Sequence, residues 1–287
     1  MDIAQLLAYG ARIAPHIPLR LGYQVCDQLG AVVGPHLPAW RRVLANLSVV
    51  LPAVSDTERQ RLARGVFAGI FKNYFDLFRY HTLSDDALLR TLVTDGAEHV
   101  TCALAKGRGV ILVGPHCGNY TIGFAPMIRH FNTRALLVVE QMSDPRVHEL
   151  MNNVRRMPGI DVEPLSPTIG RSVLQALRRN HIVVLAGDRS LTENTVMVRF
   201  FGHHTLLPSG PATLALRTRA ALIPLFCNRL PDNRSWIRFD PPLQLADSEG
   251  HQPDVRDVTQ KIAYIMQAYI RRDPSQWLVA ETVWPSA

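Results

Sequence analysis

Short runs of aliphatic and β-branched residues recur from about residue 93 onward and alternate with amphipathic segments near 120–130, 144–157 and 169–180. Parallel strands that lie side by side need a crossover connection, which is usually a helix. The alternation therefore predicts an α/β fold with a mostly parallel central sheet and flanking helices. The predicted strands are Val110–Val113, Leu136–Val139, Ile160–Val162, Ile182–Leu185, Leu222–Phe226 and Trp236–Phe239.

The first 92 residues have helical periodicity instead. Apolar residues recur at i, i+3, i+4 and i+7 over 3–14 and again over 22–33. A Ser-x-x-Glu capping box at Ser55 starts a further helix, whose aromatic stripe either belongs to the core or lines a channel for a long apolar ligand. We therefore divide the chain into an N-terminal helical segment, 1–92, and an α/β core, 93–287.

Two interpretations of the N-terminal segment remain open. Its first 50 residues contain four arginines and two aspartates among few other polar residues, and no stretch reaches the roughly 18 apolar residues that a spanning helix needs. Weakly basic helices with an apolar face can lie in a membrane interface, whereas the alternative is a helical cap on the core. The N-terminus also lacks the features of a signal peptide, so we expect a cytoplasmic protein or one anchored from that side.

Arginine carries nearly all of the positive charge. The chain has 31 Lys and Arg against 24 Asp and Glu, a net charge of +7, and only three of the cations are lysines. Residues 151–220 contain nine arginines and four acidic residues. Because the guanidinium group pairs bidentately with phosphate, this segment predicts an anionic ligand, with a solvated basic face as the alternative. We expect no nucleic-acid partner, because no zinc-finger spacing, aromatic RNA motif or long basic run is present.

Two loops that follow predicted strands carry residues suited to catalysis. The first contains His116 between glycines, and the second contains Asp188 and Arg189. Ligands of open α/β sheets bind beyond the carboxyl ends of the strands, so these loops can form one pocket. Histidine is suited to act as a general base near neutral pH, and a carboxylate at its other ring nitrogen would fix the tautomer. Asp188 is the candidate for that carboxylate, and Arg189 would face an anionic group.

Several other chemistries fail on residue type. The sequence has no phosphate loop of the G-x-x-x-x-G-K-[ST] kind, no G-x-S-x-G nucleophile elbow and no complete dinucleotide fingerprint. Cys117 is a poor nucleophile candidate because it is adjacent to His116, and adjacent side chains seldom face each other. No metal site is expected, since His203 and His204 have no further ligand at suitable spacing. The four cysteines have no C-x-x-C pair, which predicts reduced thiols rather than disulfides or a zinc site: Cys26, Cys102, Cys117 and Cys227.

At these loops the sequence resembles the lysophospholipid acyltransferase superfamily, in the branch that contains lipid A late acyltransferases and phosphatidylinositol mannoside acyltransferases. The resemblance extends over most of the chain. It rests on the order and spacing of several blocks: Arg42 with Asn46 and Pro52, His116-Cys-Gly-Asn-Tyr, Val139-Glu140 with Arg155 and Gly159, Leu185-Ala-Gly-Asp188-Arg189, Phe200-Phe201-Gly202, Gly210-Pro-Ala-Thr-Leu-Ala-Leu, and Ile223-Pro224-Leu.

This resemblance implies transfer of a fatty acyl group to a hydroxyl of a membrane glycolipid or lysolipid. The donor would be acyl-CoA or acyl-carrier protein as co-substrate, without a further cofactor or a metal. His116 would be the general base, supported by Asp188. The resemblance also implies a peripheral location at the cytoplasmic face of the inner membrane. The residues assigned to substrate binding are Asn119, Glu140, Arg155 and Arg189, of which the two arginines would contact phosphate groups.

One position departs from the family pattern. The family has H-x-x-x-x-[DE], whereas the fifth position after His116 is Thr121, whose hydroxyl cannot stabilise an imidazolium by charge. Asp188 corresponds to a glutamate of the mannoside branch and is one methylene shorter. Two alternatives to an acyltransferase remain. One is a catalytically inactive lipid-binding relative, and the other is a soluble hydrolase or nucleotide-dependent enzyme on a similar sheet.

Overall fold

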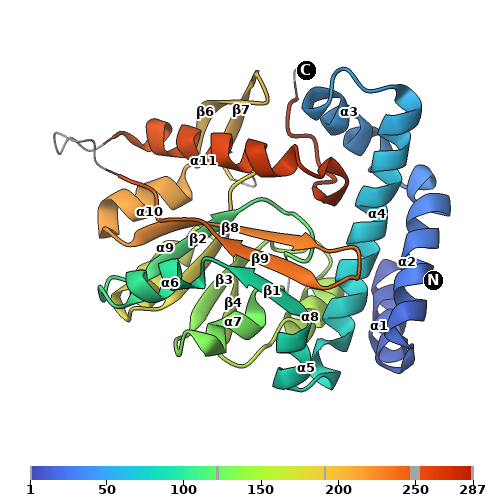
Figure 1. Cartoon of the computed structure of the whole chain (residues 1–287), viewed down its shortest axis with the longest axis horizontal. Coiled ribbons are helices and arrows are strands. Elements are labelled where there is room, and N and C mark those ends of the chain that lie inside the picture. The colour runs from blue at the N-terminus through green and yellow to red at the C-terminus, as the bar shows by residue number, and fades with distance from the viewer. Residues whose placement is uncertain (1, 121–122, 191, 246–252, 286–287) are drawn as a thin grey trace.

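The computed structural model describes residues 2–120, 123–190, 192–245 and 253–285 (Figure 1). The helices are α1 Ile3–Ile13, α2 Leu19–Val32, α3 Trp40–Val50, α4 Asp56–Arg79, α5 Asp85–Arg90, α6 Ala97–Leu104, α7 Ala125–His130, α8 Pro145–Val154, α9 Ile169–Arg178, α10 Gly210–Thr218 and α11 Val255–Ile270. The strands are β1 Leu92–Asp95, β2 Val110–Gly114, β3 Ala135–Val139, β4 Ile160–Pro164, β5 Ile182–Ala186, β6 Thr195–Phe200, β7 His203–Pro208, β8 Ala221–Arg229 and β9 Ser235–Phe239.

The central sheet has seven strands in the order β1-β9-β8-β2-β5-β3-β4. All neighbouring pairs are parallel except β8 and β9. The predicted fold class, a mostly parallel sheet with flanking helices, is therefore confirmed. Each of the six predicted strands is present, and the sequence analysis missed β1 and the antiparallel hairpin of β6 and β7.

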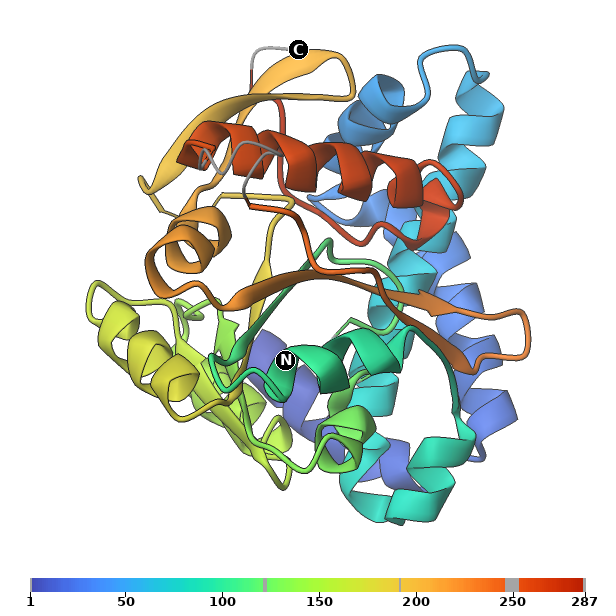
Figure 2. The same ribbon diagram turned by 60° about the vertical axis from the view of Figure 1, so that its left-hand side comes forward.

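Side chains of the central strand β2 alternate between two hydrophobic clusters. Val110 and Leu112 belong to a cluster with residues of α4, α6, α7 and α8, whereas Ile111 and Val113 belong to a cluster with residues of α9, α10 and α11. The same division is visible in two views, with α11 and the β6–β7 hairpin on one side of the sheet and α7 on the other (Figures 1 and 2). Burial on both faces explains why the parallel strands have continuous apolar runs.

The N-terminal helices pack on the α/β part of the chain. Helix α4 begins after Ser55, whose hydroxyl accepts a hydrogen bond from the Glu58 amide, as expected for the predicted cap. Its aromatic residues Phe75 and Phe78 are buried in the same cluster as Val110 and Leu112 of the sheet. The first hydrophobic cluster therefore crosses the predicted boundary at residue 92.

Helices α1 and α2 present apolar side chains to solvent. They and the turn after α2 carry ten of the fourteen exposed large hydrophobic residues in the described part of the chain. The spacing gives one exposed stripe on each helix: Ile3, Leu6, Tyr9 and Ile13 on α1, and Leu21, Val25, Leu29 and Val32 on α2. Among the described residues, no helix combines the length and the hydrophobicity that crossing a bilayer requires.

The opposite face of α2 packs closely against α4 because two of its residues are glycines. A Cβ atom at Gly30 would lie 2.5 Å from the backbone nitrogen of Ala68, and backbone atoms cannot move aside as a flexible side chain can. Gly170 in α9 provides the contrast, since a Cβ atom there would meet no atom within 4 Å. The close approach of α2 and α4 therefore depends on the absence of a side chain at Gly30.

We predict that Gly30→Ala lowers the free energy of unfolding by about 1–3 kcal/mol, the usual effect of overpacking a tight contact. Gly170→Ala should raise it by about 0.5–1 kcal/mol, since alanine loses less conformational entropy in a helix than glycine. Urea titration monitored by circular dichroism measures both changes. Equal stability of the two variants would contradict this account of the α2–α4 contact.

Candidate active site

The register of β2 and β5 brings the two candidate loops together. These strands are parallel neighbours, and their last residues, Gly114 and Ala186, are directly paired. His116 follows β2 by two residues, and Asp188 follows β5 by two residues. Because both loops leave the same edge of the sheet at the same height, the two side chains lie opposite each other.

His116 and Asp188 are joined by two hydrogen bonds. The ring nitrogen Nδ1 of His116 lies 2.7 Å from Oδ1 of Asp188, and the backbone N–H of His116 donates to Oδ2 over 2.8 Å. The predicted contact between the two residues is therefore confirmed. An ionised carboxylate only accepts hydrogen bonds, so Nδ1 of His116 is the donor, and in the neutral form of the ring this leaves the lone pair on Nε2.

A C-terminal segment supplies a further donor to this carboxylate. The indole N–H of Trp277 donates to Oδ2 of Asp188 over 2.8 Å. Sequence reasoning missed Trp277, which lies 89 positions from Asp188 in a segment without strand or helix periodicity. The last dozen residues contain two tryptophans, Trp277 and Trp284, and no local pattern connected either of them to the two loops.

The environment of Asp188 favours its charged form. Its side chain is completely buried, and burial alone would raise the pKa of a carboxyl group. The charge and hydrogen bonds of His116 and the Trp277 indole outweigh that effect and lower the pKa of Asp188 below its ordinary value. The carboxylate therefore remains ionised at neutral pH, next to a His116 ring that is 16% exposed.

The loop after β2 requires glycine two residues after the histidine. Gly118 has a φ of 50°, and a Cβ atom there would lie 2.1 Å from the carbonyl oxygen of Cys227. Both the left-handed backbone and the close approach exclude a side chain. The ring of Tyr120 is nearly perpendicular to that of His116, with centroids 4.8 Å apart, so the imidazole has an aromatic neighbour.

Asn119 joins a buried polar network. Its side chain is nearly buried, and its amide donates to Oδ2 of Asp76 over 3.3 Å and to the Ser235 hydroxyl over 3.2 Å. Asp76 also accepts from the Tyr23 hydroxyl and from Arg229, each over 2.7 Å. The observed contacts of Asn119 attach the His116 loop to the helical segment, and its predicted part in substrate binding stays a prediction.

The other predicted substrate-binding residues lie around Glu140 at the end of β3. Arg189 forms a 2.6 Å ion pair with Glu140 and a 3.4 Å ion pair with Glu281. Burial lowers the pKa of Arg155, while Tyr120 and Glu140 partly oppose that effect. In the described part of the chain, Arg155 forms no ion pair with a carboxylate. The structure therefore brings Glu140, Arg155 and Arg189 together. The positive charge of Arg189 is already balanced by its two carboxylate partners.

Burial makes the thiol of Cys117 unsuitable as a nucleophile. Cys117 is buried, and this burial raises the pKa of its thiol well above the ordinary value, as does the charge of Asp188. The thiol therefore stays protonated and does not serve as a nucleophile. Thr121, which departs from the family pattern, lies outside the described residues.

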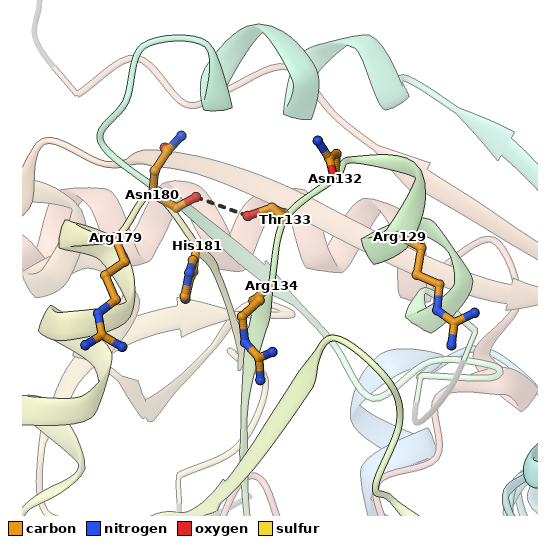
Figure 3. Close-up of a pocket in the computed structure, with 7 residues that line it drawn as sticks. All are labelled: Arg129, Asn132, Thr133, Arg134, Arg179, Asn180 and His181. Atoms are coloured by element: carbon orange, nitrogen blue, oxygen red, sulfur yellow. Dashed lines mark hydrogen bonds between the residues drawn. The ribbon is translucent and has the colours of Figure 1, made fainter.

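The basic excess of residues 151–220 is divided between different parts of the molecule. Arg179 and His181 border a hollow of about 570 Å³ that lies before β3 and β5, at the sheet edge opposite His116 (Figure 3). Arg129 and Arg179 there are at or just after the last turns of α7 and α9, where cations offset the negative end of the helix dipole. Arg134 is paired with Asp161 at 2.6 Å. Within 151–220 itself, Arg178 and Arg179 end α9 and Arg217 and Arg219 end α10, so helix ends account for four of the nine arginines.

A parallel sheet whose strand ends present a His–Asp pair matches the resemblance found in the sequence. The family described as bacterial lipid A biosynthesis acyltransferase matches residues 3–284, and the chain belongs to this family.

Named relatives agree with that assignment. A phosphatidylinositol mannoside acyltransferase of Mycobacterium tuberculosis is 32% identical over 73% of this chain and 66% of its own length. The corresponding protein of Mycolicibacterium smegmatis is 29% identical over 78% of this chain and 72% of its own. A lipid A biosynthesis acyltransferase of Haemophilus influenzae is 22% identical over 91% of this chain and 81% of its own length. The chain thus spans slightly less than two thirds of the M. tuberculosis relative.

Proposed function

We propose that this protein is an O-acyltransferase that moves a fatty acyl group from a thioester donor, acyl-CoA or acyl-carrier protein, to a hydroxyl of a glycolipid or lysolipid. The observation that carries the proposal is the 2.7 Å contact of His116 with the buried carboxylate of Asp188. Family membership supports it, as do relatives named for acyl transfer to a phosphatidylinositol mannoside and for lipid A biosynthesis.

His116 acts as the general base of the proposed reaction. Its Nε2 takes the proton of the acceptor hydroxyl while the oxygen attacks the carbonyl carbon of the thioester. The resulting tetrahedral intermediate collapses with cleavage of the C–S bond, and the departing thiolate receives the proton from the imidazolium. The products are the ester and the free thiol of the donor, and no acyl-enzyme intermediate forms.

Asp188 stabilises the imidazolium that forms during this reaction. Its carboxylate is adjacent to the ring and stays charged, so it interacts more strongly with the protonated ring than with the neutral one. This is the contribution that a carboxylate at position 121 would make in the family pattern. The intact pair therefore favours an enzyme over a catalytically inactive lipid-binding relative.

Arg155 is the better candidate for an anionic group of the substrate. Arg189 already faces two carboxylates, Glu140 and Glu281, so a phosphate there would meet negative charge. Arg155 is largely buried near Tyr120 and carries no such ion pair among the described residues. A buried guanidinium without a carboxylate partner gains most from a bidentate phosphate contact.

The exposed stripes of α1 and α2 support a peripheral location at the cytoplasmic face of the inner membrane. Nine large apolar side chains lie exposed on α1 and α2 and a tenth, Val33, in the turn that follows, and Arg12 and Arg20 are also exposed there. A helix with one apolar face and flanking cations binds a lipid interface through buried area and attraction to anionic headgroups. Such binding would bring the protein to the surface that contains its acceptor.

The central prediction concerns the catalytic pair. We expect His116→Ala and Asp188→Asn each to lower the rate of acyl transfer by about 10²–10⁴, the usual contribution of general acid–base catalysis. The double variant should be little worse than either single variant, because the two residues act as a unit. Release of free thiol from acyl-CoA or acyl-carrier protein in the presence of membrane lipid extract measures the rate, and mass spectrometry identifies the product.

Asp161→Asn is the matched control for the aspartate variant. Asp161 is 53% exposed, lies at the start of β4 and pairs with Arg134, so the rate should not change. If wild-type activity survives both His116→Ala and Asp188→Asn, the proposed mechanism is wrong.

A second prediction concerns recognition of the anionic group. Arg155→Lys retains the positive charge but loses the planar guanidinium group that can donate two hydrogen bonds to one phosphate. We therefore expect the KM for the phosphate-bearing substrate to rise by about tenfold. Arg156→Lys changes the exposed neighbouring residue and should leave KM unchanged. Steady-state kinetics at constant ionic strength distinguish the two. Equal effects would leave only a general electrostatic field.

A third prediction concerns the membrane. The double variant Val25→Asp/Leu29→Asp should weaken sedimentation with anionic vesicles by at least about tenfold, since burial of each such side chain contributes about 1.5–3 kcal/mol. Met197→Asp/Leu206→Asp, with the same charge change on an exposed pair of the β6–β7 hairpin, should retain binding. High salt should weaken wild-type binding only in part. Wild-type protein that stays in the supernatant at low salt would contradict the proposed location.

A further inference from the structure

Trp277 is a buried residue whose polar atom points at the candidate active site. Only 2% of its surface is exposed, and its indole N–H donates to the carboxylate of Asp188. We propose that Trp277 is a positioning residue, which orients the Asp188 carboxylate and thereby the general base His116. The proposal rests on the proposed function, because it assigns Trp277 to the same reaction.

The hydrogen bonds of Asp188 show what the indole contributes. Oδ1 of Asp188 accepts a hydrogen bond from Nδ1 of His116. Oδ2 accepts two, one from the backbone N–H of His116 and one from the indole N–H of Trp277. Without the indole, Oδ2 would keep one donor in a site that exposes none of the Asp188 side chain to solvent. A buried charged oxygen that loses a donor destabilises the ionised state and frees the carboxylate to rotate.

The backbone around Trp277 is attached to the loop that it supports. The amide of Leu278 donates to the carbonyl oxygen of His116 over 2.8 Å, and the amide of Gly118 donates to the carbonyl oxygen of Gln276 over 2.9 Å. Cys117 and Trp277 form an isolated antiparallel bridge between these bonds. One C-terminal segment therefore fixes both the main chain of the His116 loop and the carboxylate that holds the ring.

Aromatic packing fixes the orientation of the indole ring. Trp277 is nearly parallel to Phe201, with centroids 6.4 Å apart, and lies edge-on to Phe200 and Trp284 at 6.3 and 6.0 Å. Trp284 is 4% exposed and donates its own indole N–H to the carbonyl oxygen of Phe200 over 3.2 Å. The cluster thus contains two buried indoles, of which one supports the active site and the other a backbone carbonyl.

The direction of the pH effect follows from the groups around Asp188. His116, Cys117 and Arg189 are the titratable groups that interact with it, and the high pKa of Cys117 keeps that thiol neutral. Arg189 stays cationic, so His116 and Asp188 share the proton that is taken up as the pH falls. The Trp277 indole stabilises the form of the pair before proton uptake. Its removal makes proton uptake easier, and the acid limb of the pH profile moves to higher pH.

The test compares Trp277→Phe with Trp284→Phe. Each variant removes one indole N–H from the same aromatic cluster, so both should lose thermal stability. Trp277→Phe should also lower kcat by about tenfold with little change in KM, and its acid limb should lie at higher pH than that of the wild type. Trp284→Phe should keep the wild-type pH profile. Addition of Trp277→Phe to Asp188→Asn should cost no further rate, since the indole acts through Asp188.

An isosteric replacement and a measurement without turnover cover the cases in which Trp277→Phe does not fold or no activity is found. If Trp277→Phe does not fold, replacement of Trp277 by 3-benzothienylalanine retains the shape and removes only the donor. NMR titration of labelled His116 reports proton uptake by the pair without turnover, and its midpoint should rise in the variant that lacks the donor. If the wild-type protein cleaves no thioester, the proposed function is wrong. The NMR titration can still be measured in that case, and it tests the contact of Trp277 with the His116–Asp188 pair separately. Identical pH behaviour of the Trp277 and Trp284 variants would overturn the inference.

Discussion

The structure around the candidate site depends on the parallel pairing of β2 with β5. Val110 pairs with Ile182 and Gly114 with Ala186, so the loops that follow begin at the same height. Both faces of β2 are buried in separate clusters, and a slip of one residue would exchange the side chains of the two faces. Hydrophobic packing therefore holds the register, and the register sets the 2.7 Å contact between His116 and Asp188.

Asp188, which forms this contact, and Asp76 are both buried carboxylates, and their partners differ in a way that matches the proposed function. Asp76 faces the permanent cation Arg229 at 2.7 Å, with each side chain 8% exposed, and such a pair is a fixed structural element. Asp188 is held by neutral donors and by a histidine. Its negative charge is fully compensated only when His116 is protonated, which is the transient state that the proposed reaction produces. A permanent cation in that position would remove this preference for the imidazolium.

Sequence reasoning recovered the parts of this arrangement that have a local pattern. Apolar runs located the six predicted strands, and their ends identified His116 and Asp188 before any contact was known. It missed β1, which has only four residues, and the β6–β7 hairpin, which lies outside the central sheet. Trp277 and the network of Asp76 and Arg229 were also missed, because their contacts join residues 89 and 153 positions apart. No periodicity encodes such distant contacts.

The relation of the N-terminal helices to the site was also beyond what sequence periodicity could predict. Periodicity showed that α2 has an apolar face, but not which of its faces would be exposed. The structure places Tyr23 on the buried face, where it donates to Asp76, and Asp76 in turn accepts from Asn119 in the loop of His116. Val25 and Leu29 lie on the exposed face of the same helix. Because hydrogen bonds of 2.7 and 3.3 Å connect α2 to that loop through Asp76, the exposed stripe has a fixed orientation relative to His116. A lipid surface bound there, as the proposed function requires, would share that orientation.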